Sequence, residues 1–216
     1  MPAGAVQSLP RFGLSTPQRP SPVNPIPPVS APATSPTPNR AIFLLSLAAF
    51  ASQAMVRVSD SLLPQIAADL AVSIGAASVI VTAYGIAHGT VQLFGGEIGD
   101  RFGKYFACAG LTALAAILVF LCGLARTLPE LVAYRLACGL AAGCIIPLAM
   151  AYVGDVTPYE HRQQVLGRFL TGQISGLLFG QVAGGVLGDL FGWRNVFVIL
   201  AGLFALAAAA LVLELA

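Results

Sequence analysis

Charged residues are scarce in this sequence. Asp, Glu, Lys and Arg make up 9% of the 216 residues, whereas hydrophobic residues make up 57%. Ordinary soluble domains carry roughly 25% charged residues, which keep their surfaces hydrated. The composition therefore excludes a soluble domain and predicts a polytopic membrane protein.

Several chemistry-bearing patterns are also missing. The four cysteines form no Cys-x-x-Cys pair, so neither a disulfide framework nor a zinc site is predicted, and we expect small buried hydrophobic residues at these positions. No Gly-rich phosphate loop ending in Lys-Ser or Lys-Thr is present, which argues against direct use of ATP. We expect no metal, no cofactor and no nucleic-acid partner. The cysteines are Cys108, Cys122, Cys138 and Cys144.

The first forty residues lack Asp and Glu and contain eleven of the fifteen prolines. Proline removes backbone donors and fixes φ, and this segment offers little apolar material to bury, so residues 1–40 are predicted to form a disordered cytoplasmic tail. The first apolar run begins at Ala41 and is too long for a secretory signal. The prolines also argue against the amphipathic helix of an organellar transit peptide.

From Ala41 onwards the chain contains apolar stretches of about 20 residues, enough to cross a hydrocarbon core of about 30 Å. We predict one six-helix domain, residues 41–216, with spans at 41–64, 75–98, 105–125, 130–153, 165–188 and 195–214. Lys and Arg are biased to one side of these spans, which by the positive-inside rule predicts a cell-membrane protein with both termini in the cytoplasm. The predicted inner residues are Arg11, Arg19, Arg40, Arg101, Lys104, Arg162 and Arg168; the predicted outer ones are Arg126 and Arg194.

One loop pattern occurs twice. The run GEIGDRFGK at residues 96–104 returns as GVLGDLFG at residues 185–192, with five of eight positions identical and a sixth pairing Ile98 with Leu187. The same offset of 89 (185 − 96) also relates Gln92 to Gln181. Three spans separate the two copies, so the loops are expected on opposite sides of the membrane. The sequence therefore predicts an all-α membrane fold of two inverted three-helix repeats.

Polar side chains within the spans are the candidates for substrate or proton binding, because charged and amide groups at membrane depth must face protein or water. Arg57 and Asp60 are three residues apart and share one helix face. Two interpretations remain open: Asp60 is a carboxylate that binds and releases a proton, or the two residues form a structural ion pair near the outer interface.

Further polar candidates lie in spans 2, 4 and 5. Tyr84, His88 and Gln92 recur every four residues and form a stripe on one face of span 2. Arg135 in span 4 cannot lose its charge and needs a permanent partner or a ligand. Spans 3 and 6 are almost wholly apolar and are expected to back a polar lining made by the other four. Span 5 adds Gln173 and Gln181.

Span 5 also has a glycine at every fourth position over five turns. This spacing strips one side of the helix of side chains, so a neighbouring backbone can approach closely. Tight packing alone and a sliding or hinge surface are both open interpretations. Pro64 and Pro147 are expected to break the hydrogen-bond ladders of spans 1 and 4 locally. The five glycines are Gly172, Gly176, Gly180, Gly184 and Gly188.

Asp100 and Arg101 are predicted at a helix end with unsatisfied backbone groups, where they could form gating ion pairs with Asp155 and Arg162. We expect breakage of such pairs to bias which side of a central cavity opens.

Residues 41–216 resemble the amino-terminal half of a major facilitator superfamily transporter. Residues 96–104 resemble its motif A, residues 135–143 its motif B, and residues 155–162 the acidic-basic turn that pairs with motif A in the family. Residues 176–185 resemble the antiporter motif C, except that Gln181 stands where the family has proline. The motif A positions in register are Gly96, Asp100, Arg101, Gly103 and Lys104.

The resemblance implies alternating access by two six-helix bundles around a midplane site. It further implies export of a small organic molecule coupled to protons, in a lipid bilayer and without enzymatic activity. This chain supplies one bundle, so it is expected to be a partial transporter or to pair with a second six-helix half or a second copy of itself.

Two other classes of protein are compatible with six membrane spans. A membrane sensor or assembly protein without transport activity remains an alternative. An intramembrane hydrolase of the rhomboid type would need Ser175 to reach His88 or His161, and the glycine required two residues before the serine is replaced by Gln173.

Overall fold

The computed structural model describes residues 39–215, and every regular element in that part of the chain is a helix. The predicted tail therefore lies outside the described residues, except that Asn39 and Arg40 already belong to the first helix. The helices are α1 (Asn39–Asp69), α2 (Ile74–Ala77), α3 (Val79–Gln92), α4 (Gly95–Phe102), α5 (Lys104–Leu124), α6 (Leu128–Gly143), α7 (Ile145–Val156), α8 (Tyr159–Phe191) and α9 (Trp193–Leu215).

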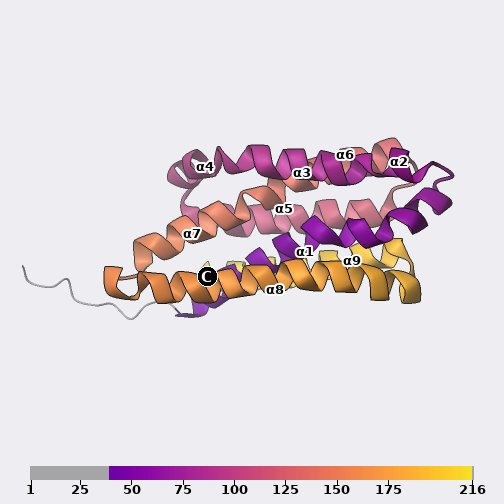
Figure 1. The fold of residues 1–216 in the computed structure, drawn as a ribbon. Coiled ribbons are helices and arrows are strands. Elements are labelled where there is room, and N and C mark those ends of the chain that lie inside the picture. The colour runs from indigo at the N-terminus through magenta and orange to yellow at the C-terminus, as the bar shows by residue number, and fades with distance from the viewer. Residues whose placement is uncertain (1–38, 216) are drawn as a thin grey trace, which may run out of the picture. The chain divides into compact units, whose positions relative to one another are not determined.

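Six segments of the described chain are long and apolar enough to cross a membrane. Four are single helices, α1, α5, α8 and α9, and two combine neighbouring helices, α2 with α3 and α6 with α7. The helices lie side by side and roughly along one direction (Figure 1). The prediction of an all-α fold with six spans is therefore confirmed, although α1 and α8 extend beyond the predicted limits of spans 1 and 5.

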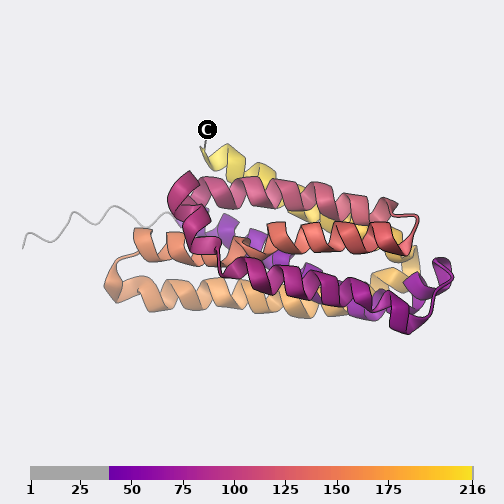
Figure 2. The same ribbon diagram turned by 90° about the horizontal axis from the view of Figure 1, so that it is seen from above.

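The two copies of the repeated loop have the same backbone geometry. Gly103 and Gly192, 89 residues apart, have φ angles of +84° and +79°, and their amides donate to the carbonyls of Gly99 and Gly188. Glycine adopts positive φ without the steric cost that a Cβ would add, so it can end one helix and begin the next at this position. The α4–α5 turn and the α8–α9 turn lie at opposite ends of the helical unit (Figure 2). This arrangement agrees with the predicted inversion of the two repeats.

Glycines permit the closest helix contacts. On α8, a Cβ added to Gly176, Gly180 or Gly184 would collide with the backbone carbonyl of a residue of α1. On α6, a Cβ at Gly139 would lie 2.7 Å from the carbonyl oxygen of Tyr84 on α3. Such close approach increases dispersion contact between helices in lipid, where no hydrophobic effect drives their association. The glycine positions thus fix α1 against α8 and α3 against α6.

The two prolines in the spans behave differently. Pro64 lies inside α1, which continues to Asp69, so the missing N–H of this proline does not end the helix. The break between α6 and α7 lies at Cys144, three residues before Pro147. A proline at position 147 has no N–H to donate to the carbonyl of Gly143, which is where α6 ends. The four cysteines are free and buried, as predicted.

Candidate functional site

Arg57 and Asp60 form an ion pair on an exposed part of α1. Arg57 Nη1 lies 3.2 Å from Asp60 Oδ2, and the side chains are 52% and 32% exposed. Asp60 precedes the end of α1 at Asp69 by nine residues, which is about 14 Å at 1.5 Å per residue. The pair therefore lies well inside the span, and its side chains are exposed on the side of the six-helix unit.

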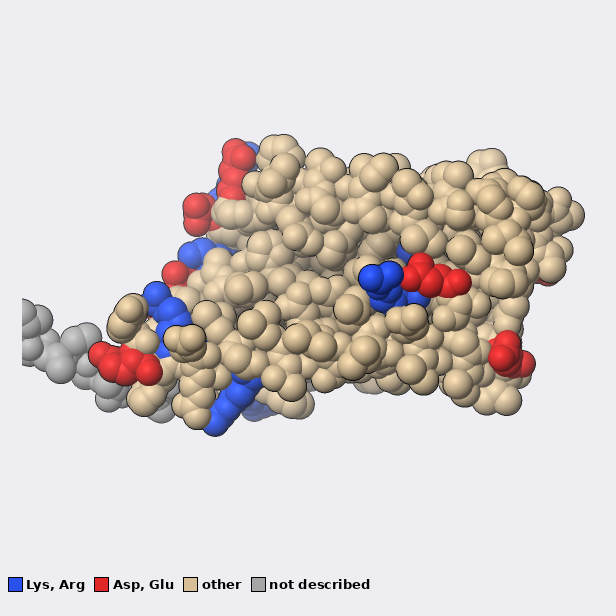
Figure 3. Space-filling view, viewed as in Figure 1, with Lys and Arg blue, Asp and Glu red and all other residues tan. Residues whose placement is uncertain are grey.

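Charge is distributed unevenly over the molecule. Figure 3 shows acidic and basic side chains gathered at the end that holds α4 and the start of α8, and a largely uncharged surface along the spans with one charged group near its middle. An exposed, paired charge within a membrane span marks a face that meets water or another polypeptide rather than lipid.

Gln53 belongs to the same face of α1 and was not among the predicted site residues. It lies four residues before Arg57 and is half-buried. The i, i+4 spacing of Gln53 and Arg57, continued by Asp60, could have identified it, because residues at this spacing share one side of a helix. The face of α1 therefore presents an amide, a guanidinium and a carboxylate in one row.

Arg135, by contrast, is fully buried on α6. Its Nε donates to the carbonyl of Ile80 at 3.4 Å and its Nη1 to the carbonyl of Met55 at 3.2 Å. The guanidinium stands 4.1 Å from the ring centroid of Tyr84 and 6.0 Å from that of Phe197. No carboxylate pairs with it among the described residues, so carbonyl dipoles and aromatic faces balance its charge.

The polar stripe of α3 faces into the bundle beside Arg135. Tyr84 and His88 are buried, with ring centroids 5.4 Å apart, and His88 Nδ1 lies 3.1 Å from Nε2 of the exposed Gln92. The Tyr84 hydroxyl donates to the Ser52 carbonyl of α1 at 3.5 Å. Arg135, Tyr84 and His88 thus form one buried cluster.

The two glutamines of α8 are not part of that cluster. Gln173 is half-buried, whereas Gln181 is exposed and its backbone carbonyl accepts a hydrogen bond from Ser61. No hydrogen bond or ion pair among the described residues connects Arg57 and Asp60 with the buried cluster. The predicted binding residues therefore separate into an exposed group and a buried group.

The gating pairs differ from the prediction. Asp155 pairs with Lys104, at 2.5 Å between Nζ and Oδ2, rather than with Arg101. Arg162 donates to the carbonyl of Gly154 at 2.6 Å. Lys104 is the first residue of α5, directly after the Gly103 turn, so its side chain reaches the end of α7 while Asp100 stays on α4.

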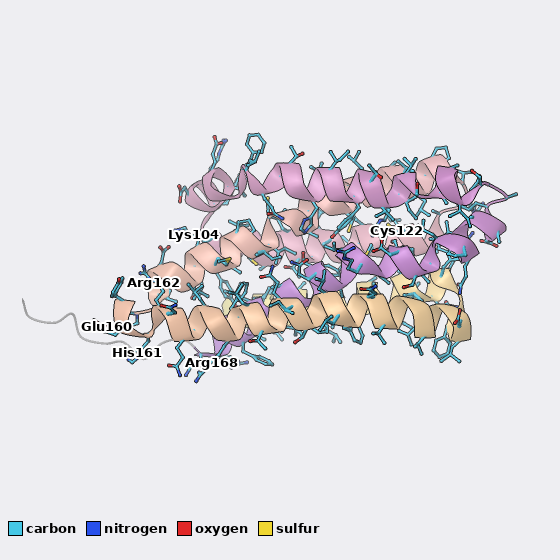
Figure 4. All side chains as sticks on the ribbon, viewed as in Figure 1. Lys104, Cys122, Glu160, His161, Arg162 and Arg168 are labelled. Carbon is cyan, nitrogen blue, oxygen red and sulfur yellow. The ribbon has the colours of Figure 1, made fainter. Side chains whose placement is uncertain are left out.

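Lys104 and Arg162 lie at the same end of the molecule (Figure 4). A crevice of about 570 Å³ opens there, lined by Asp100, Lys104, Tyr105, Tyr152 and Asp155 among others. Asp100 is exposed and forms no ion pair within the described chain. The guanidinium carbon of Arg101 lies 5.6 Å from the ring centroid of Phe102. Gly96 is exposed, and a Cβ added there would meet no atom within 4 Å.

The hydrolase alternative fails on geometry. Ser175 donates its hydroxyl to the carbonyl of Thr171 at 2.7 Å. His161 precedes it by fourteen residues on the same helix, about 21 Å along the axis. His88 is buried against Gln92, so neither histidine forms a base for this serine.

An all-helical unit of membrane-length helices in two inverted repeats is an architecture that secondary transporters use. The sequence model of the Major Facilitator Superfamily matches residues 45–215. The chain belongs to this superfamily, whose members are carriers rather than enzymes.

Named relatives agree with this assignment. The multidrug export protein EmrB of Haemophilus influenzae is 29% identical over 155 residues, covering 72% of this chain and 30% of the relative. The multidrug resistance protein MdtG of Proteus mirabilis is 34% identical over 108 residues, covering 50% and 27%. The riboflavin transporter RibZ of Clostridioides difficile is 28% identical over 138 residues, covering 63% and 30%. The chain spans about a third of the length of these relatives.

Solved structures share the fold. A bacterial homologue of the human lysosomal transporter Spinster superposes with a TM-score of 0.69 at 21% identity, covering 84% of this chain and 45% of that one. The POT family transporter PepTSo gives a TM-score of 0.71 at 21% identity, covering 82% and 37%. At these identities the likeness concerns the fold alone.

Proposed function

We propose that this chain forms one six-helix half of a transporter that exports a small organic molecule by alternating access, driven by protons. The observation that carries the proposal is the Arg57–Asp60 pair, which is exposed on the side of α1 yet lies well inside the span. Charges at that depth are costly and are associated with substrate and ion pathways. The multidrug names of two relatives support export as the direction.

The proton step is assigned to Asp60. As a carboxylate it holds Arg57 through a charge-assisted hydrogen bond. Proton binding removes that charge and frees the guanidinium, which then donates hydrogen bonds to an anionic or polar group of the substrate or of the facing bundle. In this proposal the buried cluster of Arg135, Tyr84 and His88 supports the site from inside the six-helix unit.

The facing bundle is a second six-helix half or a second copy of this chain. In this proposal the exposed face of α1 turns toward it, and the Lys104–Asp155 pair, with Asp100 beside it, controls opening on the cytoplasmic side. The bias of Lys and Arg toward that end supports a cell-membrane protein with both termini in the cytoplasm. A blue-native gel of the purified chain tests for the paired assembly.

Dye efflux tests the transport proposal. The chain is expressed in bacteria that lack their main drug exporters, and the loss of preloaded ethidium or riboflavin is followed by fluorescence. We expect faster efflux than in cells with empty vector, and we expect a proton uncoupler or Asp60→Asn to abolish the difference. Glu130→Gln, which changes a carboxylate at the start of α6, is the matched control and should retain efflux. Equal efflux of both probes with and without the membrane-inserted chain would refute transport by paired copies of this chain.

A further inference from the structure

A second polar cluster lies at the end of the helical unit opposite the Lys104–Asp155 pair. Its centre is Asp69, the last residue of α1. Asp69 Oδ2 accepts a hydrogen bond from Trp193 Nε1 at 3.2 Å and pairs with Arg194 Nη2 at 2.9 Å. Both donors come from the first turn of α9, so the cluster connects the end of the first span with the start of the sixth.

Arg194 extends the cluster to a third span. Its Nη1 donates to the carbonyls of Gly123 and Ala125 at the end of α5, and its guanidinium stands 4.3 Å from the Trp193 ring centroid. The contact is tight, because a Cβ at Gly123 would lie 2.9 Å from the Arg194 carbonyl oxygen. One guanidinium therefore connects α1, α5 and α9.

The position of this cluster follows the inverted repeat. Lys104 begins the third span and pairs with Asp155, in the last turn of the fourth. Trp193, 89 residues later, begins the sixth span and bonds Asp69, which ends the first. In both cases the start of the last helix of one repeat donates to the aspartate that ends the first helix of the other.

The two ends differ in one respect. Asp189, the repeat equivalent of Asp100, accepts a hydrogen bond from Gln65 of α1 at 3.1 Å. Asp100 has no such hydrogen bond or ion pair within the described residues. The end of α1 is thus held by two aspartates, one of its own and one from α8, whereas the end of α7 is held by the Lys104–Asp155 pair and the hydrogen bond from Arg162 to the carbonyl of Gly154.

We propose that Asp69, Trp193 and Arg194 are positioning residues that hold the ends of α1 and α5 against the start of α9, as the repeat counterpart of the Lys104–Asp155 pair. Loss of the cluster frees the ends of α1 and α5 from the start of α9, so that the end of α5 around Gly123 can open. The inference concerns the six-helix unit alone and does not depend on the proposed transport activity.

Cys122 is a native reporter for this opening. It is buried on α5 and directly precedes Gly123, whose carbonyl accepts from Arg194. Figure 4 shows it well away from Lys104, toward the opposite end of the bundle. Cys108 is equally buried near the other end of the same helix, so it reports general unfolding.

The experiment measures labelling of the 216-residue chain in lipid nanodiscs by a water-soluble maleimide, which reaches both membrane faces. Peptide mass spectrometry assigns the modified cysteine, and Cys122→Ala identifies its signal. We expect Asp69→Asn and Arg194→Gln each to raise the labelling rate of Cys122 by about tenfold, the scale on which loss of a charge-assisted hydrogen bond changes an opening equilibrium. Cys108 should remain protected.

Two controls make the test specific. Glu130→Gln changes another carboxylate at the same end of the helical unit. Glu130 accepts a hydrogen bond from the Arg126 backbone N–H at 2.9 Å. This variant should leave Cys122 protected. The double variant Asp69→Asn with Arg194→Gln should label Cys122 more slowly than the product of the two single effects predicts, because both substitutions remove the same cluster. Unchanged labelling of Cys122, or equal labelling of Cys122 and Cys108, would overturn the proposal.

Discussion

At the scale of single residues, burial separates two arginines that look alike in the sequence. Arg57 is exposed and paired with Asp60, whereas Arg135 is buried and held by two carbonyls and the Tyr84 ring. An exposed pair contributes little to stability, since solvent screens it and its side chains lose entropy. The two arginines should therefore respond differently to substitution.

For the exposed pair, we expect Asp60→Asn and Arg57→Gln to change the free energy of unfolding by no more than about 1 kcal/mol. Thermal unfolding in detergent, followed by tryptophan fluorescence of Trp193, measures this. Because both substitutions should abolish efflux in the dye assay, the loss of function would not result from misfolding. A large fall in stability would identify the pair as a structural one.

For the buried arginine, we expect Arg135→Ala to lower the free energy of unfolding by about 3 kcal/mol, since it leaves a cavity and removes the cation–π contact with Tyr84. Arg135→Met fills most of the volume without burying a charge, so it should unfold close to the temperature of the parent chain. The comparison uses the same fluorescence assay. If Met is as destabilising as Ala, the charge itself is required for the fold.

At the scale of the helices, glycine decides which pairs approach closely. The close contact of α1 and α8 depends on Gly176, Gly180 and Gly184, each of which faces a backbone carbonyl of α1. Gly172 belongs to the same sequence pattern, but a Cβ there would lie 3.4 Å from Ser46 Cβ, so the helices are further apart. The glycines are regularly spaced in the sequence, but their distances to α1 differ.

This difference gives a matched pair of substitutions. We expect Gly180→Ala to destabilise the chain by about 1–3 kcal/mol, because the new methyl group must push α1 away from α8. Gly172→Ala should be neutral or slightly stabilising, since alanine favours the helix and meets only ordinary contact. Thermal unfolding of both variants in the same detergent tests the prediction. Equal effects at the two positions would show that the α1–α8 distance is adjustable.

At the scale of the whole molecule, the inverted repeat relates its two ends. The Gly103 and Gly192 turns have equivalent backbone geometry at opposite ends, and each is followed by a residue that contacts an aspartate of the other repeat. The polar partners are not the same, because Lys104 is replaced by Trp193 followed by Arg194. The two ends therefore share an architecture with different chemistry.

The inversion predicts the membrane topology. We expect a membrane-impermeant maleimide added to intact cells to label Asp189→Cys and to leave Asp100→Cys unmodified until the membrane is opened. Both positions are exposed, and the native cysteines are buried and should contribute little background. Labelling of both variants from the same side would contradict the inverted arrangement.

The six spans and the repeat could be predicted from the sequence because both are linear properties. Apolar length determines how many helices cross a bilayer, and an offset of 89 residues over three spans requires inversion. The positions of Arg57, Asp60 and Arg135 within spans follow in the same way. The direction in which each side chain points cannot be predicted from these linear properties.

Only the tertiary structure decided the orientation of each helix about its own axis. That orientation depends on which faces pack, and glycine contacts between helices distant in sequence determine it. It buries Arg135 without a carboxylate, leaves Arg57 exposed, and directs Lys104 rather than Arg101 to Asp155. It also brings Asp69 to Arg194, 125 residues away, a contact that no local pattern indicates because it forms only when the first and sixth spans meet.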